Sequence, residues 1–279
     1  MNSLFEYLNY RDYLCDFYHE KKKEHRFYSY RLFSQKAGFK SPNFLKLVID
    51  GQRNLTKESV FKFCKALGLK KKECEYFENL VFFNQSKTLE EKNVYLNIMM
   101  KYRKKADPRK IERSEYEYYS AWYHPVIREL ATSADFHDDF AKLAQATIPA
   151  ITEAEARNSV NILCELGFVR RVKGTYVKAA ASLSTGAQVA SVAIANYHKA
   201  MMRLASESIE RFGASQRDIT SVTLNISSTT RQALVEKLAQ FRRELLELAE
   251  SDQNPDNVVQ LNFQLFALSH TYPGKRKRS

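Results

Sequence analysis

Apolar residues recur at three- and four-residue spacings through most of the chain, which is the pattern of amphipathic helices. Only 8 Gly and 6 Pro occur in 279 residues, so the connections between helices should be short. We therefore predict a mainly α fold with an N-terminal helical domain and small β elements nearer the C-terminus. The helices predicted for the N-terminal part span residues 4–23, 30–37, 41–50, 55–67, 70–84 and 89–100.

Residues 30–50 carry the most specific local pattern, in which one helix stops and another starts almost at once. Gly38 can adopt the positive φ that closes a helix. Ser41 is a good N-cap, and Pro42 then occupies the first helical position, where its missing N–H costs nothing. A break of about four residues is the turn length of a helix–turn–helix. The pattern predicts that motif at 30–50, supported by the helix at 55–67.

The second helix of this motif, 41–50, is predicted to bury one face and to offer the other to DNA. The outward face is polar and short enough for a major groove about 12 Å wide. Asn43 could pair with adenine, Lys46 could reach guanine or a phosphate, and Leu47 could touch a thymine methyl group. Flanking polar residues are placed to contact the DNA backbone. The predicted DNA-binding set is Lys40, Ser41, Asn43, Lys46, Leu47, Gln52, Arg53 and Asn54.

The formal net charge of +12 belongs almost entirely to one end of the chain. Residues 1–111 hold 24 Lys and Arg against 13 Asp and Glu, a balance of +11, whereas residues 112–279 hold 20 against 19, a balance of +1. A positive domain attracts a polyanion, and phosphate contact is the sequence-independent part of DNA affinity. Double-stranded DNA is therefore the predicted partner of the N-terminal domain.

The helical pattern stops at Asp107-Pro108, because the residue before a proline is disfavoured in a helix. This break predicts a first domain, with its linker helix, at 1–106. The next segment is rich in aromatic residues, for which core packing is the favoured use and an effector pocket or interface is the alternative. The candidates for that pocket or interface are Tyr119, Trp122, Tyr123 and His124.

Residues 112–181 are predicted to form a winged-helix-like module, because a helix at 152–166 is followed by two short strands. In DNA-binding winged helices the last helix contacts the groove. Here that helix carries Glu153, Glu155 and Glu165, which phosphates would repel. We therefore interpret the module as a scaffold or interaction domain, and its cationic hairpin leaves a secondary DNA contact open.

Residues 182–273 are predicted to hold a long helix, about 188–212, and a small βαβ unit. Apolar and polar residues alternate over 222–226 and 259–265, the pattern of half-buried strands, on both sides of a further helix. A two-stranded unit is too small to be stable alone. It must borrow strands from the wing region or from another subunit, which indicates a dimerisation or sensor module. Residues 274–279 are predicted to be a basic tail.

Several stretches of the sequence are similar to one bacterial family found in predatory and fibre-degrading lineages. They are FSQKAGFKSPNFLKLVIDGQRNLTKESVFKFCKALGL, FFNQSKTLEEKN, AWYHPVIREL, LCELGFVRR, RDITSVTLNIS and VVQLNFQLFALS. The first stretch also resembles the Cro/phage-repressor class of helix–turn–helix domains. The resemblance implies a transcriptional regulator with an N-terminal domain of that class and a C-terminal domain of unknown function.

Other features of the sequence disfavour several classes of protein. No stretch approaches the roughly 20 apolar residues that span a bilayer. The first dozen residues contain acids and an Arg, unlike a signal peptide. Four scattered cysteines fit reduced thiols, so we predict a cytoplasmic protein. No Gly-rich phosphate loop, metal-spaced Cys/His set or nucleophile motif is present, so we predict no enzyme activity, cofactor or metal.

Together these features predict a sequence-specific DNA-binding transcriptional regulator that acts as a homodimer and places residues 41–50 in the major groove. The alternative is a protein-interaction or effector-binding adaptor whose helix–turn–helix does not contact bases. Two features favour the alternative. Asp50 lies on the outward face, and Tyr30 stands near the position where the Cro class often has a phosphate-binding Gln.

Overall fold

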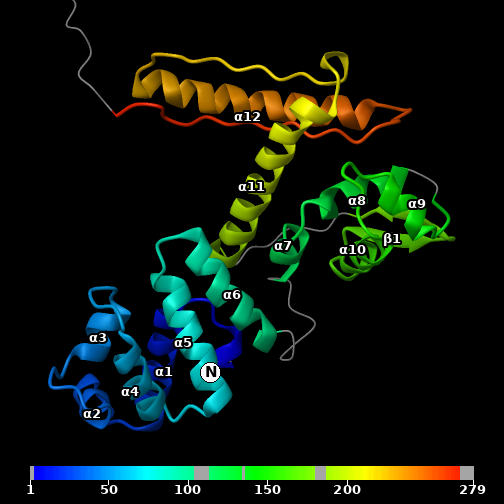
Figure 1. Cartoon of the computed structure of the whole chain (residues 1–279). Coiled ribbons are helices and arrows are strands. Elements are labelled where there is room, and N and C mark those ends of the chain that lie inside the picture. Colours follow the sequence, from blue (N-terminus) through cyan, green and yellow to red (C-terminus); the bar gives the residue numbers. More distant parts are fainter. Residues whose placement is uncertain (1–2, 104–112, 134–135, 180–186, 271–279) are drawn as a thin grey trace, which may run out of the picture. The chain divides into compact units, whose positions relative to one another are not determined.

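The computed structural model describes residues 3–103, 113–133, 136–179 and 187–270, which are mainly helical (Figure 1). This part of the chain forms twelve α-helices, two 3-10 helices and one two-stranded sheet. The predicted mainly α fold with small β elements is confirmed. The chain divides into two units. The first comprises Met1–Ala121, Glu165–Phe168 and Ala180–Tyr197, and the second comprises Trp122–Cys164, Val169–Ala179 and His198–Ser279.

Six helices of the first unit lie where the sequence predicts them, with shifted ends. The first begins at Tyr10 and not at residue 4, because Asn9 caps it by accepting the Arg11 N–H at 2.9 Å. Leu4–Glu6 form a separate 3-10 helix, η1. The six helices are α1 (Tyr10–Glu24), α2 (Tyr30–Lys36), α3 (Phe44–Ile49), α4 (Lys57–Leu67), α5 (Lys71–Gln85) and α6 (Leu89–Arg103).

Helix α3 is shorter than the predicted 41–50. Ser41 is not its N-cap, because the Phe44 N–H donates to the Ser41 carbonyl at 3.3 Å and residues 42 and 43 lie in the resulting turn. At the other end Gly51 adopts a φ of 78°, which takes the chain out of the helix. The helix therefore has fewer than two full turns, and it depends on its neighbours for stability.

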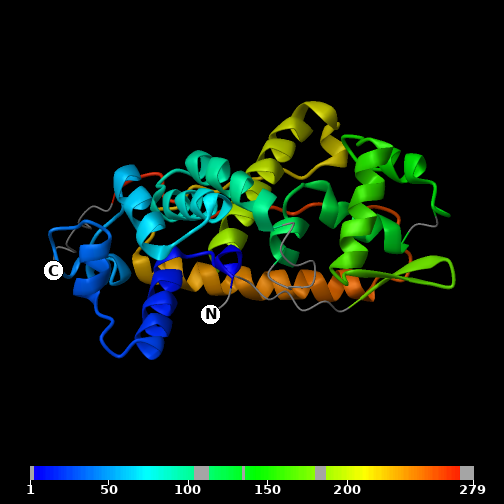
Figure 2. The ribbon, with the colours of Figure 1, turned by 90° about the horizontal axis from the view of Figure 1, so that it is seen from below.

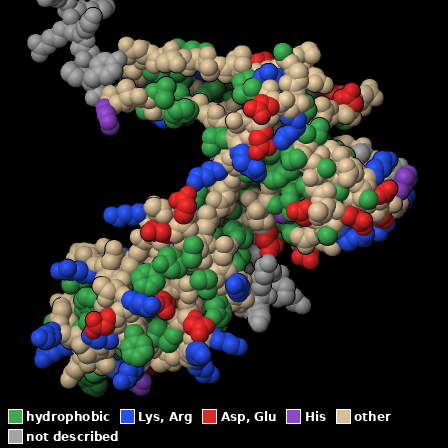
Figure 3. Space-filling view, in the orientation of Figure 1, with side chains coloured by type: hydrophobic (Ala, Val, Ile, Leu, Met, Phe, Trp, Pro, Cys, Tyr) green, Lys and Arg blue, Asp and Glu red, His purple; other side chains and the backbone are tan. Residues whose placement is uncertain are grey.

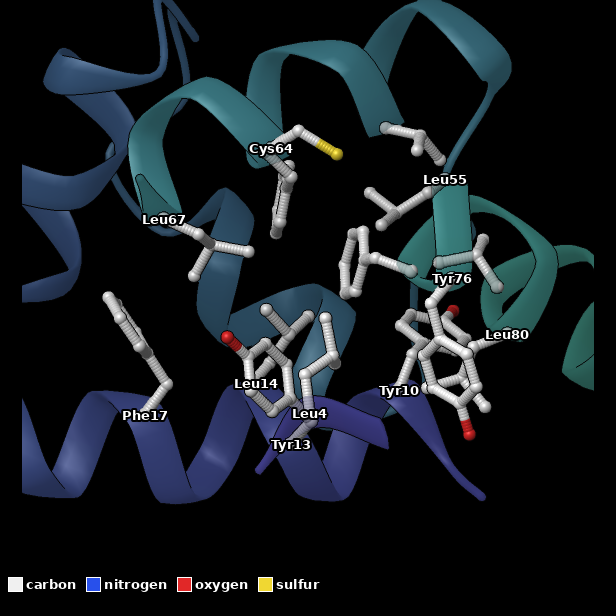
Figure 4. Packing of buried hydrophobic residues seen from close by; sticks show 14 of the residues in the cluster. Leu4, Tyr10, Tyr13, Leu14, Phe17, Leu55, Cys64, Leu67, Tyr76 and Leu80 are labelled. Carbon is white, nitrogen blue, oxygen red and sulfur yellow. The ribbon is translucent and has the colours of Figure 1, made fainter. Parts of the chain in front are cut away.

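A single apolar core holds these helices together (Figure 4). Burying one large apolar side chain contributes about 1.5–3 kcal/mol, so this core dominates the stability of the unit. The Tyr76 hydroxyl donates to the Tyr7 carbonyl at 2.8 Å and so fixes the N-terminal segment against α5. The core includes the fully buried residues Tyr10, Leu14, Phe33, Leu45, Phe63, Tyr76, Phe77 and Leu80.

Two later helices contribute to the same unit. Helix α7 spans Arg113–Tyr118, and α11 spans Ala187–Arg211, within one residue at each end of the predicted 188–212. Val192 of α11 is buried in the N-terminal core. Asn93 and Asn196 exchange two amide hydrogen bonds, of 3.1 and 2.7 Å, between α6 and α11. The start of the long helix is therefore part of the N-terminal unit.

In the second unit three helices precede a hairpin. The hairpin strands are β1 (Val169–Val172) and β2 (Thr175–Lys178), antiparallel, with Val169 opposite Lys178. The turn residues Lys173 and Gly174 have φ values of 50° and 87°, as a two-residue type I′ turn requires. The two strands predicted after the 152–166 helix are confirmed. The helices are α8 (Tyr123–Ser133), α9 (Phe140–Gln145) and α10 (Glu153–Glu165).

Helix α12 (Ser228–Ser251) is straight and uninterrupted in both views (Figures 1 and 2). The Ser227 side chain caps it by accepting the Thr230 N–H at 3.2 Å. Extended segments run along this helix, but 222–226 and 259–265 are not strands, which corrects the βαβ prediction for the single chain. The physical reason is that a strand requires a hydrogen-bonded neighbour, and no ladder joins either segment to another within the described residues.

Two sequence predictions, the break at Asp107-Pro108 and the basic tail at 274–279, lie outside the described residues. Among the helices that the structure describes, none is both long enough and apolar enough to cross a bilayer.

Candidate nucleic-acid interface

The turn between α2 and α3 is fixed by three hydrogen bonds. Gly38 adopts a φ of 73°, and its N–H donates to the Gln35 carbonyl at 3.1 Å. The Phe39 N–H donates to the Ser34 carbonyl at 2.8 Å. The buried Ser34 hydroxyl donates in turn to the Pro42 carbonyl at 3.2 Å. The end of α2 therefore holds the turn that leads into α3.

The inward face of α3 packs on an aromatic cluster. Leu45 and Val48 are fully buried. The Phe44 ring stacks on the Phe39 ring with centroids 4.3 Å apart, and Phe63 of α4 meets Phe39 edge-on at 5.6 Å. Aromatic pairs of this kind contribute about 0.5–1.5 kcal/mol beyond the area that they bury. This packing determines which face of the short helix points to solvent.

The eight predicted DNA-contacting residues all lie on one stretch between the end of α2 and the start of α4. On α3 and its first turn Asn43 and Lys46 are exposed, and Leu47 is half-buried. The structure therefore brings the whole set to one surface segment, and its contact with DNA stays a prediction. The remaining members, all exposed, are Lys40, Ser41, Gln52, Arg53 and Asn54.

Residues 31–53 expose five cationic side chains, with Asp50 as the one acid among them. None of the five forms an ion pair within the described chain. Figure 3 shows Lys and Arg side chains spread over the surface of the N-terminal domain. Because these cations have no acidic partners, they can bind phosphates without first breaking an ion pair. They are Arg31, Lys36, Lys40, Lys46 and Arg53.

Arg11 of α1 holds the end of α3 and the turn that follows. Its guanidinium donates to the Val48 carbonyl, to the Arg53 carbonyl at 3.1 Å and to the Asn54 side-chain oxygen at 2.7 Å. A hydrogen bond from a charged donor contributes about 1.5–3 kcal/mol. Arg11 therefore positions Arg53 and Asn54, two members of the predicted set, and occupies the amide oxygen of Asn54.

Gln85, at the end of α5, holds the chain on the far side of the same segment. Its side-chain nitrogen donates to the Leu55 carbonyl at 2.9 Å, and its side-chain oxygen accepts the Leu55 N–H at 2.8 Å. The same oxygen accepts the Tyr10 hydroxyl at 3.0 Å. Because Leu55 is buried, these bonds satisfy backbone groups that would otherwise be costly to bury.

The roles of Arg11 and Gln85 were not predicted from the sequence. Arg11 lies 37 residues before Val48, and Gln85 lies 30 residues after Leu55, so periodicity carries no sign of either contact. The available signal is weak. Each stands beside other polar residues, Asp12 next to Arg11 and Asn84 next to Gln85, so composition does not single it out.

The aromatic residues proposed for an effector site fall into different units. Tyr119 belongs to the first unit, where its ring meets the Tyr197 ring edge-on at 5.1 Å. Trp122 and Tyr123 belong to the second unit, and their rings meet edge-on at 5.8 Å. Both contacts are ordinary aromatic packing, so an effector role for these residues stays a prediction.

His124 is a buried histidine of the second unit. Its Nδ1 lies 2.7 Å from the Ser159 hydroxyl, which is also buried. Burial lowers the pKa of His124 from 6.5 to about 4, because a charged imidazolium would lose its hydration. His124 is therefore neutral at pH 7. It is a hydrogen-bonded residue of the core, and these contacts do not indicate a ligand site.

Acidic side chains engage several cations of the second unit. Arg171 of the hairpin pairs with Asp138, and Lys178 lies 2.5 Å from a carboxylate oxygen of Glu129. This pairing contrasts with the unpaired cations of residues 31–53. Arg171 is engaged in this way, and a secondary DNA contact through the hairpin stays a prediction.

The acids before α9 have structural roles. The Asp139 carboxylate caps α9 by accepting the Lys142 N–H at 2.9 Å, and the Tyr176 hydroxyl donates to Asp138 at 2.8 Å. Within the described residues no group of three or more His, Cys, Asp or Glu is placed to hold a metal ion. The roles of these acids are therefore structural: Asp139 caps α9, and Asp138 binds Tyr176 and Arg171.

Comparison with known families assigns the C-terminal part of the chain to a family. A family model for a domain of unknown function, DUF4423, matches residues 102–268 and so confirms the predicted C-terminal domain of unknown function. The match does not include residues 30–54. No curated protein and no solved structure matches the chain. Because the match covers more than half of the 279 residues, the chain belongs to the DUF4423 family.

Proposed function

We propose that the protein is a sequence-specific DNA-binding transcriptional regulator in which α2 and α3 form a Cro-type helix–turn–helix. One observation carries the proposal. The segment 31–53 buries Phe33, Leu45 and Val48 and exposes five cations, and none of these cations has an acidic partner within the described chain. A surface of this kind attracts a polyanion, because clustered exposed cations create a positive potential and can take up phosphates with release of counterions.

In this proposal α3 lies in the major groove and its flanks hold the DNA backbone. Asn43 and Lys46 contact base edges, since an amide suits adenine and an ammonium suits guanine. Leu47 contacts a thymine methyl group. The backbone contacts come from residues on the two flanks of α3, which are Lys40, Ser41, Gln52, Arg53 and the free amide nitrogen of Asn54.

The second unit supports this function without contacting bases. We infer that α8, α9, α10 and the hairpin form a winged-helix-like scaffold, supported by their order along the chain. The acids of α10 would repel phosphates, and Asp138 already pairs with Arg171, so we expect this scaffold to bind the DNA backbone weakly. Two copies of the chain, acting in the cytoplasm, would place their α3 helices in half-sites about 34 Å apart, one turn of DNA.

The test is selection of binding sites from a random DNA library by the full chain, followed by anisotropy titration of the selected duplex. We expect a recurring site with two related halves, bound at least a thousandfold more tightly than an unrelated duplex at the same salt concentration. Binding that shows no sequence preference at any salt concentration would overturn the proposal.

The alternative is a protein-interaction adaptor whose α2–α3 pair does not contact bases. Two observations favour it. Asp50 is exposed at the end of α3, where it would face phosphates, and Arg11 already occupies the Asn54 amide oxygen. Binding of random DNA at low salt, with an affinity equal to that for any selected duplex, would support the adaptor.

A further inference from the structure

The connection between α1 and α2 forms a turn that holds an aromatic side chain in solvent. The Tyr28 N–H donates to the His25 carbonyl at 2.9 Å and closes a turn over residues 25–28, with Arg26 and Phe27 exposed at its tip. Phe27 is 91% exposed, the highest value among the exposed large apolar residues of the described chain. Single apolar residues on a surface are ordinary, so a role for Phe27 needs support from its surroundings.

An aromatic base fixes the 25–28 turn to the N-terminal domain. The Tyr18 ring stacks on the Tyr30 ring with centroids 3.9 Å apart, and the Tyr28 ring lies 6.0 Å from the Tyr18 ring. Tyr18 belongs to α1 and Tyr30 to α2, so this base joins the two helices that the turn connects. Figure 2 shows the connection, in dark blue, at the edge of the domain. Phe27 is therefore held in solvent by packed neighbours.

The residues next to Phe27 in sequence add positive charge without acidic partners. Lys22, Lys23 and Arg26 are exposed, and none of them forms an ion pair within the described residues. Glu24, the one acid between residues 21 and 29, is paired with Lys21 at 2.6 Å. An apolar side chain among free cations matches the minor groove of DNA, where proteins insert apolar wedges between bases and bind the flanking phosphates.

The turn lies beyond the end of α3 that carries Asp50. Burial raises the pKa of Tyr30, and the charge of Asp50, among its neighbours, adds to this rise. Burial and then nearby acids, which include Asp50, likewise raise the pKa of Cys15 in α1. This end of α3 is therefore near the middle of α1 and the start of α2. From Cys15 to Glu24, α1 extends about 13 Å, and the turn follows at its end.

This distance is close to the spacing between the grooves of DNA. One turn of the duplex measures about 34 Å, so a minor groove lies about 17 Å from the centre of the major groove. With α3 in the major groove and α1 running along the duplex, the tip of the turn reaches the next minor groove. That groove is only about 6 Å wide, which admits one side chain from a turn but not a helix.

We propose that Phe27 enters the minor groove beside the half-site bound by α3 and wedges between two base pairs. This inference rests on the proposed function and adds a contact outside the eight predicted residues. The neighbouring cations bind phosphates at the edges of the groove, and the wedge unstacks one base step and bends the duplex. Because pyrimidine–purine steps unstack most easily, the wedge adds a sequence preference at a step that α3 does not contact.

Anisotropy titration of the full chain against two duplexes tests the wedge. One duplex carries the selected site with a further turn of flanking DNA, and the other is trimmed at the edge of the α3 contacts. Trimming should weaken binding of the wild type about fivefold more than binding of Phe27→Ala, since both proteins lose the same phosphates and only the wild type loses the wedge. Phe27→Leu keeps an apolar wedge and should respond to trimming as the wild type does.

The matched control is Phe61→Ala, which removes another exposed phenyl ring of the same domain, 74% exposed on α4. It should bind both duplexes as the wild type does, and circular dichroism checks that every variant retains its helix content. The salt dependence of Phe27→Ala should equal that of the wild type, because a phenyl ring releases no counterion. A loss for Phe61→Ala equal to that for Phe27→Ala would overturn the assignment to Phe27.

The fluorescence of 2-aminopurine, which rises when this base leaves the stack, locates the wedge. Placed at each flanking step in turn, it should brighten about twofold or more at one position with the wild type and with Phe27→Leu, and not with Phe27→Ala. Selective DNA binding with no bright position, or with equal losses on trimming, overturns the wedge and leaves the proposed function in place. Binding without sequence preference overturns both.

Vesicles of phosphatidylglycerol test the other surface that suits a basic turn with an exposed aromatic ring. We expect no difference between the wild type and Phe27→Ala in cosedimentation with these vesicles. If the wild type bound them, Phe27→Ala did not, and the two proteins were equal on both duplexes, Phe27 would be a membrane contact and the wedge would be overturned.

Discussion

Asn93 and Asn196, 103 residues apart in sequence, exchange two side-chain amide hydrogen bonds between α6 and α11. Each amide both donates to and accepts from the other, so the pair satisfies itself. Val192, one turn earlier on α11, is buried in the N-terminal core. This contact joins the start of the long helix to the domain that holds residues 30–54.

A double-mutant cycle should measure this link. Asn93→Ala and Asn196→Ala should each lower the free energy of unfolding, and the coupling between them should be about 1 kcal/mol, because each substitution removes both hydrogen bonds. The measurement is urea unfolding followed by circular dichroism. Asn97→Ala, at an exposed position of α6, is the control and should change stability by less than about 0.5 kcal/mol. A coupling of zero would show that the pair does not join the helices.

Lys46→Ala and Asn43→Ala should each weaken binding to the selected DNA site by about 1–3 kcal/mol and relax the preference at particular base pairs. The reason is that each removes a side chain that faces base edges in the proposed complex. Anisotropy titration against the selected duplex and its single-base variants gives the loss. Lys87→Ala removes the same charge from an exposed position outside the segment, and it should leave the base preference unchanged.

Arg53→Ala should weaken binding to all DNA sequences alike and reduce the slope of log K against log salt by about 1. A phosphate contact releases a counterion and carries no sequence information, which explains both effects. Titrations at four salt concentrations measure the slope. If the loss were confined to one base pair, Arg53 would contact a base and not the backbone.

Arg11→Met should lower the free energy of unfolding by about 1–3 kcal/mol, because the bonds to the Val48 and Arg53 carbonyls are lost while the aliphatic length is kept. DNA affinity should also fall, since α3 and its following turn lose their support. The salt slope should stay as in the wild type, because Arg11 does not contact phosphate in the proposed complex. Arg26→Met is the control for stability, as Arg26 is exposed and its removal breaks no such bond. A reduced salt slope for Arg11→Met would instead place Arg11 on the DNA.

His124 should make the protein less stable in acid. Its pKa is about 4 in the folded chain, below the ordinary histidine value of 6.5, so below pH 6.5 the unfolded chain binds the extra proton. The stabilisation from the neutral ring is complete above pH 6.5 and falls as the pH drops towards 4, where the loss reaches about 3 kcal/mol.

The check is urea unfolding of the wild type and of His124→Gln between pH 7 and pH 4. Comparison with the variant removes the contribution of the carboxylates, which titrate in both proteins. The difference in stability between the two should shrink or reverse as the pH falls. A constant difference would show that His124 is not buried as a neutral ring.

Local signals in the sequence account for much of the N-terminal domain. The α2–α3 turn needs a residue that tolerates positive φ, and Gly38 supplies it. The apolar spacing of α3 assigns Leu45 and Val48 to the core and leaves Lys46 between them exposed. These features depend on contacts within a few residues, which periodicity and capping preferences record directly.

The ends of elements and the strands were less predictable. Helix α3 begins at Phe44 and not at Ser41, because hydrogen bonds of the turn compete with the cap. The alternation over 222–226 and 259–265 indicates strands, yet neither forms in the single chain. A strand depends on a neighbour that the sequence of one segment does not specify.

The sequence by itself determined the helical class, the concentration of positive charge before residue 112 and the segment at 30–54 as a candidate interface. Only the tertiary structure decided that Arg11 and Gln85 support that segment and that His124 is a neutral core residue. The physical reason is distance along the chain. Propensity, capping and charge act over a few residues, whereas a buried polar contact depends on which distant elements the core brings together.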